Sequence, residues 1–319
     1  MAKSRICIAL GGNAVIPRGQ RGTINEQRQN VTNTAEQIIP LAKDHKIVIT
    51  HGNGPQIGNL MLQQEAGSQS PTNIPIMPFD VSGAMTQGQI GYLIQNILGN
   101  LLLKQNLSTQ VVTIVTQVIV SADDFAFQSP SKPVGPFYQS KQMDSIRLQH
   151  PNWDFIEDAG RGFRRIVPSP DPIRVHEEDC ISKLLDAGFI VVAAGGGGIP
   201  IIKTEMGFQG VEAVIDKDLA SERLASAIDA KTLAILTDTD RIYRHFGTRD
   251  AEGIDIIRLT DLIDQIKQKA FGTKLKGSMG PKLEAARRFL ISGGRRVIVS
   301  RPELLIEALR GKAGTTIVP

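Results

Sequence analysis

The chain has 319 residues, of which 41% are hydrophobic and 21% are charged, which is the balance of an ordinary globular protein. This length predicts one large domain or two moderate ones, with a core that needs no disulfide or metal to hold it. The formal net charge is only +4 and no long run of lysine or arginine occurs. Composition therefore excludes a disordered chain, and the charge does not by itself argue for nucleic acid as a partner.

Cysteine usage and the length of the apolar runs narrow the class of protein further. Two cysteines, Cys7 and Cys180, are too few for a disulfide framework or a four-cysteine metal site. Both lie in regular-looking segments and are expected to be buried thiols. No run reaches the roughly 18 apolar residues of a membrane helix, and no long apolar stretch follows the charged first residues, so no signal peptide is expected. We therefore expect no membrane association and a cytoplasmic location.

Short β-branched runs alternate along the chain with longer amphipathic ones. The short runs predict strands over residues 5–10, 46–50, 110–120, 189–194, 232–237 and 296–300. Apolar residues at helical spacing predict helices over residues 26–44, 84–105, 281–292 and 302–309. Such alternation is typical of an α/β fold around a largely parallel sheet, in which ligands bind at the carboxyl ends of the strands.

One stretch interrupts this rhythm. Residues 121–172 are rich in proline, glycine and aromatic side chains and hold the only tryptophan, Trp153. Because its aromatic residues are able to pack, we expect an inserted subdomain or lid at this place, not a linker.

Glycines follow three of the expected strands, at Gly11 and Gly12, at Gly52 and Gly54 around Asn53, and at residues 195–198. Glycine lets the backbone turn sharply and bring N–H groups close to an anion. An ordinary turn explains the first two loops as well, and His51 is expected to be structural. Four glycines in a row favour a phosphate or substrate loop over a turn. Neither the Walker nor the Rossmann spacing occurs, which disfavours a P-loop NTPase and a dehydrogenase.

Three lysines lie beside glycine, proline or aspartate on constrained segments. They are Lys132, Lys217 and Lys282. Phosphoryl transfer needs fixed positive charge near the moving group, although for any one of these lysines taken alone a solvated surface charge is the better explanation. Asp216 and Asp218 flank Lys217, where they are able to orient lysines, bind Mg²⁺ or cap the following helix.

Two further segments keep two interpretations each. Arg161, Arg164 and Arg165 suit an anion site, or ion pairs with Glu157 and Asp158. Tyr243, at the end of a strand, suits an adenine pocket or the protein core.

Taken together, the motifs resemble those of the amino acid kinase family, and within it the enzymes that use carbamoyl phosphate. The matching segments are Leu-Gly-Gly-Asn-Ala at 10–14, His-Gly-Asn-Gly-Pro-Gln at 51–56, 83–92, 130–138, 158–170, Ala-Gly-Gly-Gly-Gly-Ile-Pro at 194–200, 210–219 and Gly-Ser-Met-Gly-Pro-Lys at 277–282. They follow the family's order over nearly the whole chain. The resemblance implies a three-layer αβα sandwich with a protruding lid subdomain, and a homodimer. It implies reversible phosphoryl transfer between carbamoyl phosphate and ADP, giving ATP and carbamate, with Mg²⁺.

The same resemblance assigns roles by position. It implies a carbamoyl phosphate half over residues 1–211, including the lid at about 121–172, and a nucleotide half over residues 212–319. Catalytic roles fall on Lys132, Lys217, Asp218 and Lys282. Substrate and phosphate contacts fall on Gly11, Gly12, Asn13, Gly52, Asn53, Gly54, Gly195, Gly196 and Gly197. Nucleotide contacts fall on Asp238, Tyr243, Gly277, Ser278 and Met279, and the nucleotide phosphates are expected to carry Mg²⁺. In the family this chemistry serves ATP production from the breakdown of arginine, purines or related compounds, and in some organisms the synthesis of carbamoyl phosphate.

The sequence departs from the family pattern at Phe125, where proline is usual, which puts the lid's motion in question. Three rivals remain. The first is a family member that phosphorylates another small carboxylate, the second is a nucleotide-binding regulator without activity, and the third, suggested only by the sequence pI of about 9.1, is a nucleic-acid binder. Retention of all three lysines speaks against the second.

Overall fold

The computed structural model describes residues 3–17, 19–158, 160, 162–268, 271 and 279–319. Eight strands form its central sheet, in the order β15-β17-β16-β12-β1-β2-β9-β3. Their bounds are β15 Ile256–Arg258, β17 Thr315–Val318, β16 Arg296–Ser300, β12 Thr232–Leu236, β1 Ser4–Leu10, β2 His45–His51, β9 Ile190–Val192 and β3 Val111–Thr113. Every neighbouring pair is parallel except β16 with β17. The expectation of a largely parallel sheet is confirmed.

The central strands are buried on both faces, which explains their continuous apolar sequences. In β1, the side chains of Ile6 and Ile8 point into one hydrophobic cluster and that of Cys7 points into another. Neighbouring side chains of a strand face opposite ways, so each strand contributes to two cores. The molecule is therefore a three-layer αβα sandwich, as the sequence predicts.

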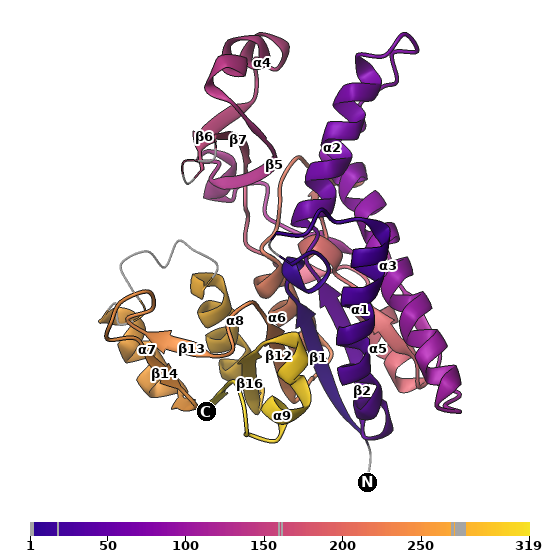
Figure 1. Cartoon of the computed structure of the whole chain (residues 1–319), viewed down its shortest axis with the longest axis vertical. Helices are drawn as coiled ribbons and strands as arrows, with labels where there is room; N and C mark the ends of the chain where they lie inside the picture. The colour runs from indigo at the N-terminus through magenta and orange to yellow at the C-terminus, as the bar shows by residue number, and fades with distance from the viewer. Residues whose placement is uncertain (1–2, 18, 159, 161, 269–270, 272–278) are drawn as a thin grey trace.

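Helices cover both faces of the sheet (Figure 1). One face carries α1 Ile24–Ile38, α3 Phe79–Lys104 and α9 Leu305–Leu309. The other carries α5 Glu178–Asp186, α6 Lys217–Ala227, α7 Leu259–Lys267 and α8 Met279–Ile291. Helix α1 begins at a capping box, in which Thr23 accepts the Glu26 N–H and the Glu26 carboxylate accepts the Thr23 N–H. The tail of the expected helix 26–44 is a tighter 3₁₀ turn over Ile39–Lys43, with Pro40 in its first turn.

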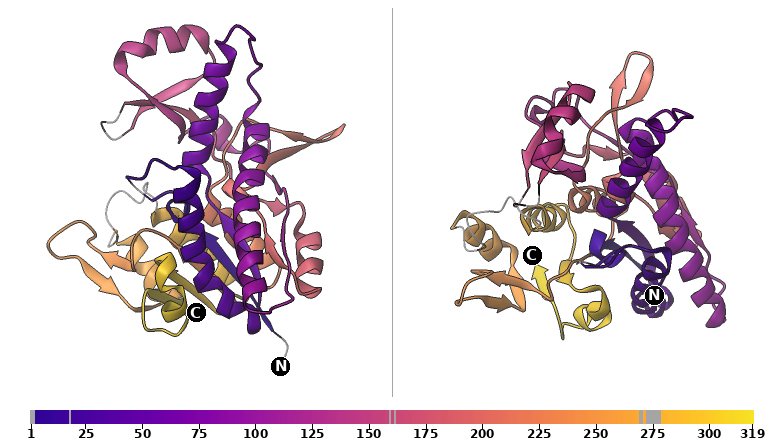
Figure 2. Two further views of the ribbon diagram at one scale, coloured as in Figure 1. Left: turned by 45° about the vertical axis from the view of Figure 1, so that its right-hand side comes forward. Right: turned by 45° about the horizontal axis from the view of Figure 1, so that its top comes forward.

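A lid projects from the sandwich beside helix α2, Gly54–Ser68 (Figures 1 and 2). It consists of the antiparallel sheet β5-β7-β6 and helix α4. The bounds are β5 Lys132–Tyr138, β6 Asp154–Glu157, β7 Phe163–Val167 and α4 Met143–Gln149. These elements lie within the expected insertion, residues 121–172. An apolar seam of Ile57, Met61, Phe79, Val134 and Val167 joins the lid to α2 and α3.

A second, smaller sheet runs in the order β11-β10-β4-β8. Its strands are β4 Gln117–Ile119, β8 Arg174–Val175, β10 Ile199–Thr204 and β11 Gly207–Gly210. The hairpin of β10 and β11 extends away from the body (Figure 2). A separate hairpin is formed by β13 Ile242–Arg244 and β14 Glu252–Ile254.

Two sequence-based expectations were wrong. The strand expected over residues 110–120 is broken: β3 belongs to the large sheet and β4 to the small one, with residues 114–116 between them. Cys180 is exposed, whereas Cys7 is buried. The inner face of α5 is defined by Ile181 and Leu185, one turn apart, and Cys180 lies off that stripe.

Candidate active site

Three glycine-containing loops meet at the carboxyl edge of the large sheet, as expected for parallel strands. A Cβ added to Gly52, after β2, would lie 2.8 Å from the Gly12 nitrogen, after β1. A Cβ added to Gly196, after β9, would lie 2.4 Å from the Asn53 amide nitrogen. The loops are therefore in direct contact, and a side chain at Gly52 or Gly196 would have no room. Gly11 lies behind this meeting point, where its N–H donates to the Leu236 carbonyl at 2.9 Å.

The loop at residues 195–198 has an unusual backbone. Ala194, Gly196, Gly197 and Gly198 all have positive φ, between 49° and 94°. A left-handed φ is costly for a residue with a Cβ, and a Cβ at Gly197 would lie 2.2 Å from the Ile215 carbonyl oxygen. Within the described chain, the N–H groups of Gly195 and Gly196 donate to no acceptor. Both are therefore free for a ligand.

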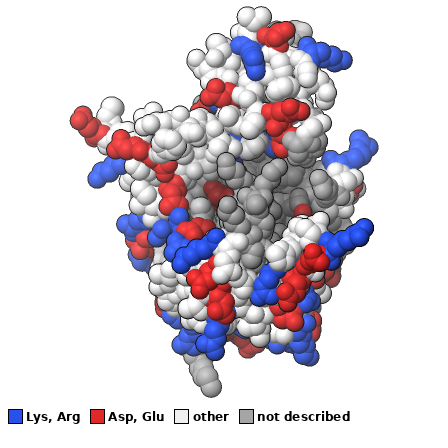
Figure 3. Space-filling view, turned by 90° about the vertical axis from the view of Figure 1, so that its left-hand side faces the viewer, with Lys and Arg blue, Asp and Glu red and all other residues white. Residues whose placement is uncertain are grey.

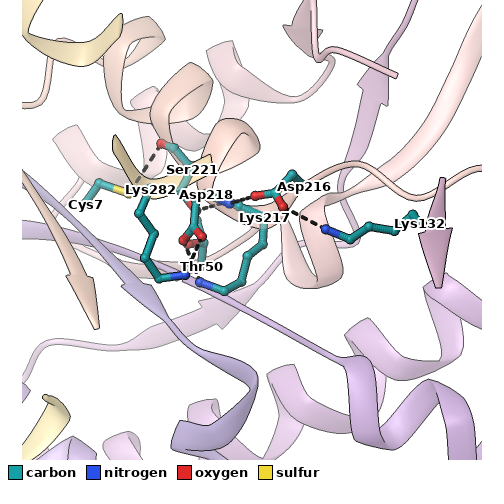
Figure 4. Close-up of polar contacts among 8 residues, drawn as sticks. All are labelled: Cys7, Thr50, Lys132, Asp216, Lys217, Asp218, Ser221 and Lys282. Atoms are coloured by element: carbon teal, nitrogen blue, oxygen red, sulfur yellow. Dashed lines mark hydrogen bonds and ion pairs between the residues drawn. The ribbon is translucent and has the colours of Figure 1, made fainter. Parts of the chain in front are cut away.

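Asp218 is the centre of the charged part of the site (Figure 4). Its Oδ1 accepts from Lys217 Nζ at 2.7 Å and its Oδ2 accepts from Lys282 Nζ at 3.0 Å. Asp218 and Lys282 are almost fully buried. Burial would raise the pKa of Asp218, but the two ammonium groups outweigh it and lower the pKa to about 2. The carboxylate therefore stays ionised and holds both lysines in a fixed position.

Lys132 enters the site from the lid. It is the first residue of β5, and its Nζ donates to Asp216 Oδ2 at 2.8 Å (Figure 4). The other oxygen of Asp216 accepts from the Asp218 N–H at 2.9 Å and caps α6. Of the roles left open for Asp216, the structure thus contains two, a helix cap and a partner for a lysine. This carboxylate joins the lid directly to the helix that carries Lys217.

A layer of small polar groups fixes α6 from behind. Ser221 Oγ donates to the Lys217 carbonyl at 2.6 Å and lies 2.5 Å from Thr50 Oγ1 on β2. Cys7 contacts the Ser221 carbonyl, and burial raises the pKa of its thiol to about 12. The thiol is therefore a packing group. His51, wholly buried, also remains neutral because burial lowers its pKa to about 4; its ring lies against Gly195, in agreement with the structural role expected for it.

These groups surround a cavity of about 350 Å³ between the lid, α2 and the glycine loops. Of the residues expected to hold substrate or phosphate, those that line it are Gly12, Gly52, Asn53, Gly54, Gly195, Gly196, Lys132, Lys217, Asp218 and Lys282. Four cationic side chains and three carboxylates face this cavity, Arg164 and Asp80 among them. The surplus of positive charge suits a small anion.

The arginine segment divides between its two interpretations. Arg164 lines the cavity and is also paired with Asp158, Nη1 to Oδ2, at 3.1 Å. Arg165 is buried, where it pairs with Glu212 and stacks on Trp153 with 4.2 Å between the guanidinium and the ring centre. The ion pair with Glu212 joins the lid to the segment before α6. Arg161 lies outside the described residues.

The expected nucleotide residues do not gather at this cavity. Asp238, Tyr243 and Met279 are absent from its described lining. The Tyr243 hydroxyl donates to Asp240 Oδ1 at 2.9 Å, and Met279 begins α8 and packs on the core. Gly277, Ser278 and the side chain of Asn13 lie outside the part of the chain that the structure describes.

Among the buried polar groups next to the site, Gln87 is one that sequence reasoning missed. Gln87 on α3 is 2% exposed and contacts the glycine loop through the Gly195 carbonyl. Its position offered a signal, because it is spaced three and seven residues from the buried Ile90 and Ile94 and so lies on the inner, apolar face of the helix.

Comparison with known proteins agrees with this geometry. Residues 4–300 match the model of the amino acid kinase family, and the chain belongs to that family of phosphotransferases. It is 48% identical to the carbamate kinase of Pyrococcus horikoshii, over 99% of both chains, and 49% identical to that of Thermococcus kodakarensis, over 98% and 99%. The structure of carbamate kinase from Giardia lamblia bound to AMP-PNP superposes with a TM-score of 0.91 at 38% identity, covering 99% of each chain.

Proposed function

We propose that this chain is an ATP:carbamate phosphotransferase, which moves a phosphoryl group reversibly between carbamoyl phosphate and ADP to give ATP and carbamate. The observation that carries the proposal is the set of three lysines, from the lid, α6 and α8, held by Asp216 and Asp218 around a glycine-lined cavity. The near full-length similarity to carbamate kinases supports the choice of substrate.

The chemistry fits the residues. In phosphoryl transfer, negative charge spreads over the moving group and the bridging oxygen, and catalysis consists mostly of positioning and charge stabilisation. Carbamate offers few atoms to grip, so affinity must come from the phosphate, through backbone N–H groups and lysines. The attacking group is an anion in either direction, and no general base is needed. Lys217, which is partly buried, and Lys282, which is buried, are both held by Asp218, so little reorganisation of these charges is needed during the reaction.

We assign carbamoyl phosphate to residues 1–211 and the nucleotide to residues 212–319. The free N–H groups of Gly195 and Gly196 and the amide of Asn53 support a phosphate contact in the first half. Asn13 is proposed as a further polar contact there. Asp238, Tyr243, Gly277, Ser278 and Met279 are proposed as nucleotide neighbours, reached beyond the cavity.

Mg²⁺ is proposed to enter with the nucleotide. No three carboxylate, imidazole or thiol groups converge on a metal position within the described ranges. Asp216 and Asp218 already hold lysines. Mg²⁺ commonly binds through substrate phosphates with few protein ligands, and this donor set fits that mode. When bound, the ion would neutralise charge on the phosphate oxygens.

We also propose a cytoplasmic homodimer that acts in arginine breakdown. Helix α3 exposes apolar side chains beside the sheet's edge strand β3, among them Tyr92 (59%) and Leu103 (71%).

Two free thiols suit a reducing compartment. Within the described residues, no helix is both long and apolar enough to span a membrane. Figure 3 shows acidic and basic side chains interspersed over one face, an arrangement that does not favour nucleic acid.

A panel of acyl phosphates tests the substrate. Purified protein with ADP and Mg²⁺ should form ATP from carbamoyl phosphate far faster than from acetyl phosphate or an amino acid side-chain acyl phosphate. Preference for one of the others would instead identify a family member with a different carboxylate acceptor.

A further inference from the structure

Gln87 and Thr116 form a buried bracket behind the glycine loop. Gln87 Nε2 donates to the Gly195 carbonyl at 3.0 Å and to the Thr116 carbonyl at 3.1 Å. Its Oε1 accepts from the Thr116 N–H at 2.8 Å. Gln87 and Thr116 are 2% and 0% exposed. Both ends of the side-chain amide are therefore hydrogen-bonded to the backbone of two segments that are far apart in the sequence.

Thr116 extends the bracket to the other end of the loop. Its hydroxyl accepts from the Ala194 N–H at 2.9 Å, and its carbonyl accepts from the Ile199 N–H at 2.9 Å. The loop is thus held before, within and after its glycines. This arrangement also accounts for the break between β3 and β4, since Thr116 turns its backbone toward Gln87 instead of continuing the strand.

The loop needs such support. Backbone conformations with successive positive φ angles persist only where the surroundings determine them. Ala194, the residue at the loop's entrance, has a φ of 49° despite its side chain. His51 and Gln87 both pack against Gly195, and Asn53 packs against Gly196. The first two glycines of the loop are therefore tightly enclosed by side chains from β2, α3 and the segment before α2.

We propose that Gln87, together with Thr116, is a positioning residue for phosphoryl transfer. The bracket holds the N–H groups of Gly195 and Gly196 toward the cavity, ready for a phosphate. The inference rests on the proposed function. Neither Gln87 nor Thr116 lines the cavity, so they act through the loop and not on the substrate.

The chain offers a control on the same helix. Gln95, two turns after Gln87 on α3, accepts from the Thr113 N–H at 2.9 Å, a bond to strand β3 and not to the loop. Both variants remove side-chain hydrogen bonds between α3 and backbone, three in Gln87→Leu and one in Gln95→Leu. Gln87→Leu should lower kcat/KM for carbamoyl phosphate by about 10- to 100-fold, the scale of a misplaced reacting group, and leave the Kd for ADP within about twofold. Gln95→Leu should leave both unchanged.

A second pair covers the case in which Gln87→Leu does not fold. Thr116→Val deletes the hydroxyl that holds Ala194. Thr113→Val deletes a buried hydroxyl without a hydrogen-bond partner in the described structure. Only Thr116→Val should reduce kcat/KM for carbamoyl phosphate.

Binding of inorganic phosphate separates this inference from the proposed function. The affinity for phosphate is measured from the rise in melting temperature that the ion produces. Weaker phosphate binding in Gln87→Leu than in Gln95→Leu supports the bracket whichever acyl phosphate the enzyme uses. Equal phosphate affinity and equal kcat/KM in the two members of each pair would overturn it. A wild-type protein that binds phosphate but makes no ATP from carbamoyl phosphate would instead count against the proposed function.

Discussion

Asp218 and Asp186 are each shared by two cationic side chains, but in opposite surroundings. Asp218 is buried between Lys217 and Lys282. Asp186 lies between Arg5 and Lys46 with 53% of its side chain exposed. Removing one partner of a buried ion pair leaves charge without compensation, whereas water screens an exposed one. The same substitution at the two positions therefore isolates the effect of burial.

We expect Asp218→Asn to lower the free energy of unfolding by about 3–5 kcal/mol and to reduce turnover by roughly 100-fold or more, since both lysines lose their anchor. Asp186→Asn should keep turnover unchanged. Denaturant unfolding and steady-state assays of the two variants provide the comparison. Equal activity in Asp218→Asn and Asp186→Asn would contradict the role of Asp218.

The pH dependence of stability follows from the same residue. The folded-state pKa of Asp218 is about 2, below its ordinary value of 3.8. Its ion pairs therefore stabilise the fold fully above about pH 4, and that stability is lost as the pH falls toward 2. The loss should be smaller in Asp218→Asn, as measured by melting temperature against pH.

At the scale of elements, the glycine loop and the β10–β11 hairpin offer two glycines with similar backbones and different surroundings. Gly197 has a φ of 94°, and an added Cβ would meet the Ile215 carbonyl at 2.2 Å. Gly207 has a φ of 118° with nothing within 4 Å of that position. Gly197→Ala should lower the free energy of unfolding by about 3 kcal/mol or more, because backbone strain and overpacking add together.

Gly207→Ala should lower the free energy of unfolding by about 1–2 kcal/mol, because it adds backbone strain alone. It should leave activity intact, whereas Gly197→Ala should inactivate the enzyme. Chemical denaturation of both proteins measures the difference. Similar stabilities would mean that Gly197 is not packed against the segment that leads into α6.

The lid contains its own spectroscopic probe. The ring of His150 stacks on Trp153, the only tryptophan, with 3.7 Å between ring centres. Burial lowers the pKa of His150 below its ordinary 6.5, and Arg165 adds to that effect while Glu65 opposes it. The lid therefore favours neutral His150, and protonation at falling pH costs stability. Because an imidazolium ring stacked on indole quenches its emission, Trp153 fluorescence should fall with a midpoint below pH 6.5.

His150→Gln should abolish this fluorescence step, and His176→Gln, outside the lid, should retain it. A midpoint at or above 6.5, or a step that survives His150→Gln, would show that the two rings are not stacked in solution.

Much of the element pattern was predictable because buried parallel strands have continuous apolar sequences and amphipathic helices have regular spacing. The strand at 110–120 was not, since its break depends on Gln87, a residue from another helix. The link between Lys132 and Asp216 was also hidden, because 84 residues separate them and no local pattern reports such a contact. Local signals thus predicted the loops, the family resemblance assigned the lysines and Asp218, and the contact between Lys132 and Asp216 required the fold.

At the scale of the whole molecule, the two edges of the large sheet are β3 and β15. Exposed apolar residues lie near both, with Tyr92 on α3 beside β3 and Ile256 in β15, which is 68% exposed. If α3 forms the dimer interface, Tyr92→Asp should shift the protein to monomers in sedimentation, because it places a charge in a desolvated contact. Ile256→Asp should remain dimeric. Dimers in both variants would exclude this surface.

The central claim is that fixed lysines transfer a phosphoryl group between carbamoyl phosphate and ADP. The most direct test is ATP formation from carbamoyl phosphate, ADP and Mg²⁺ by the wild-type protein and by Lys217→Ala, with folding of both verified. We predict rapid ATP formation by the wild type and loss of most turnover in Lys217→Ala, because Asp218 keeps Lys282 in place and the fold survives. No ATP above the spontaneous background from folded wild-type protein that binds ADP, or near-normal turnover in Lys217→Ala, would contradict this account.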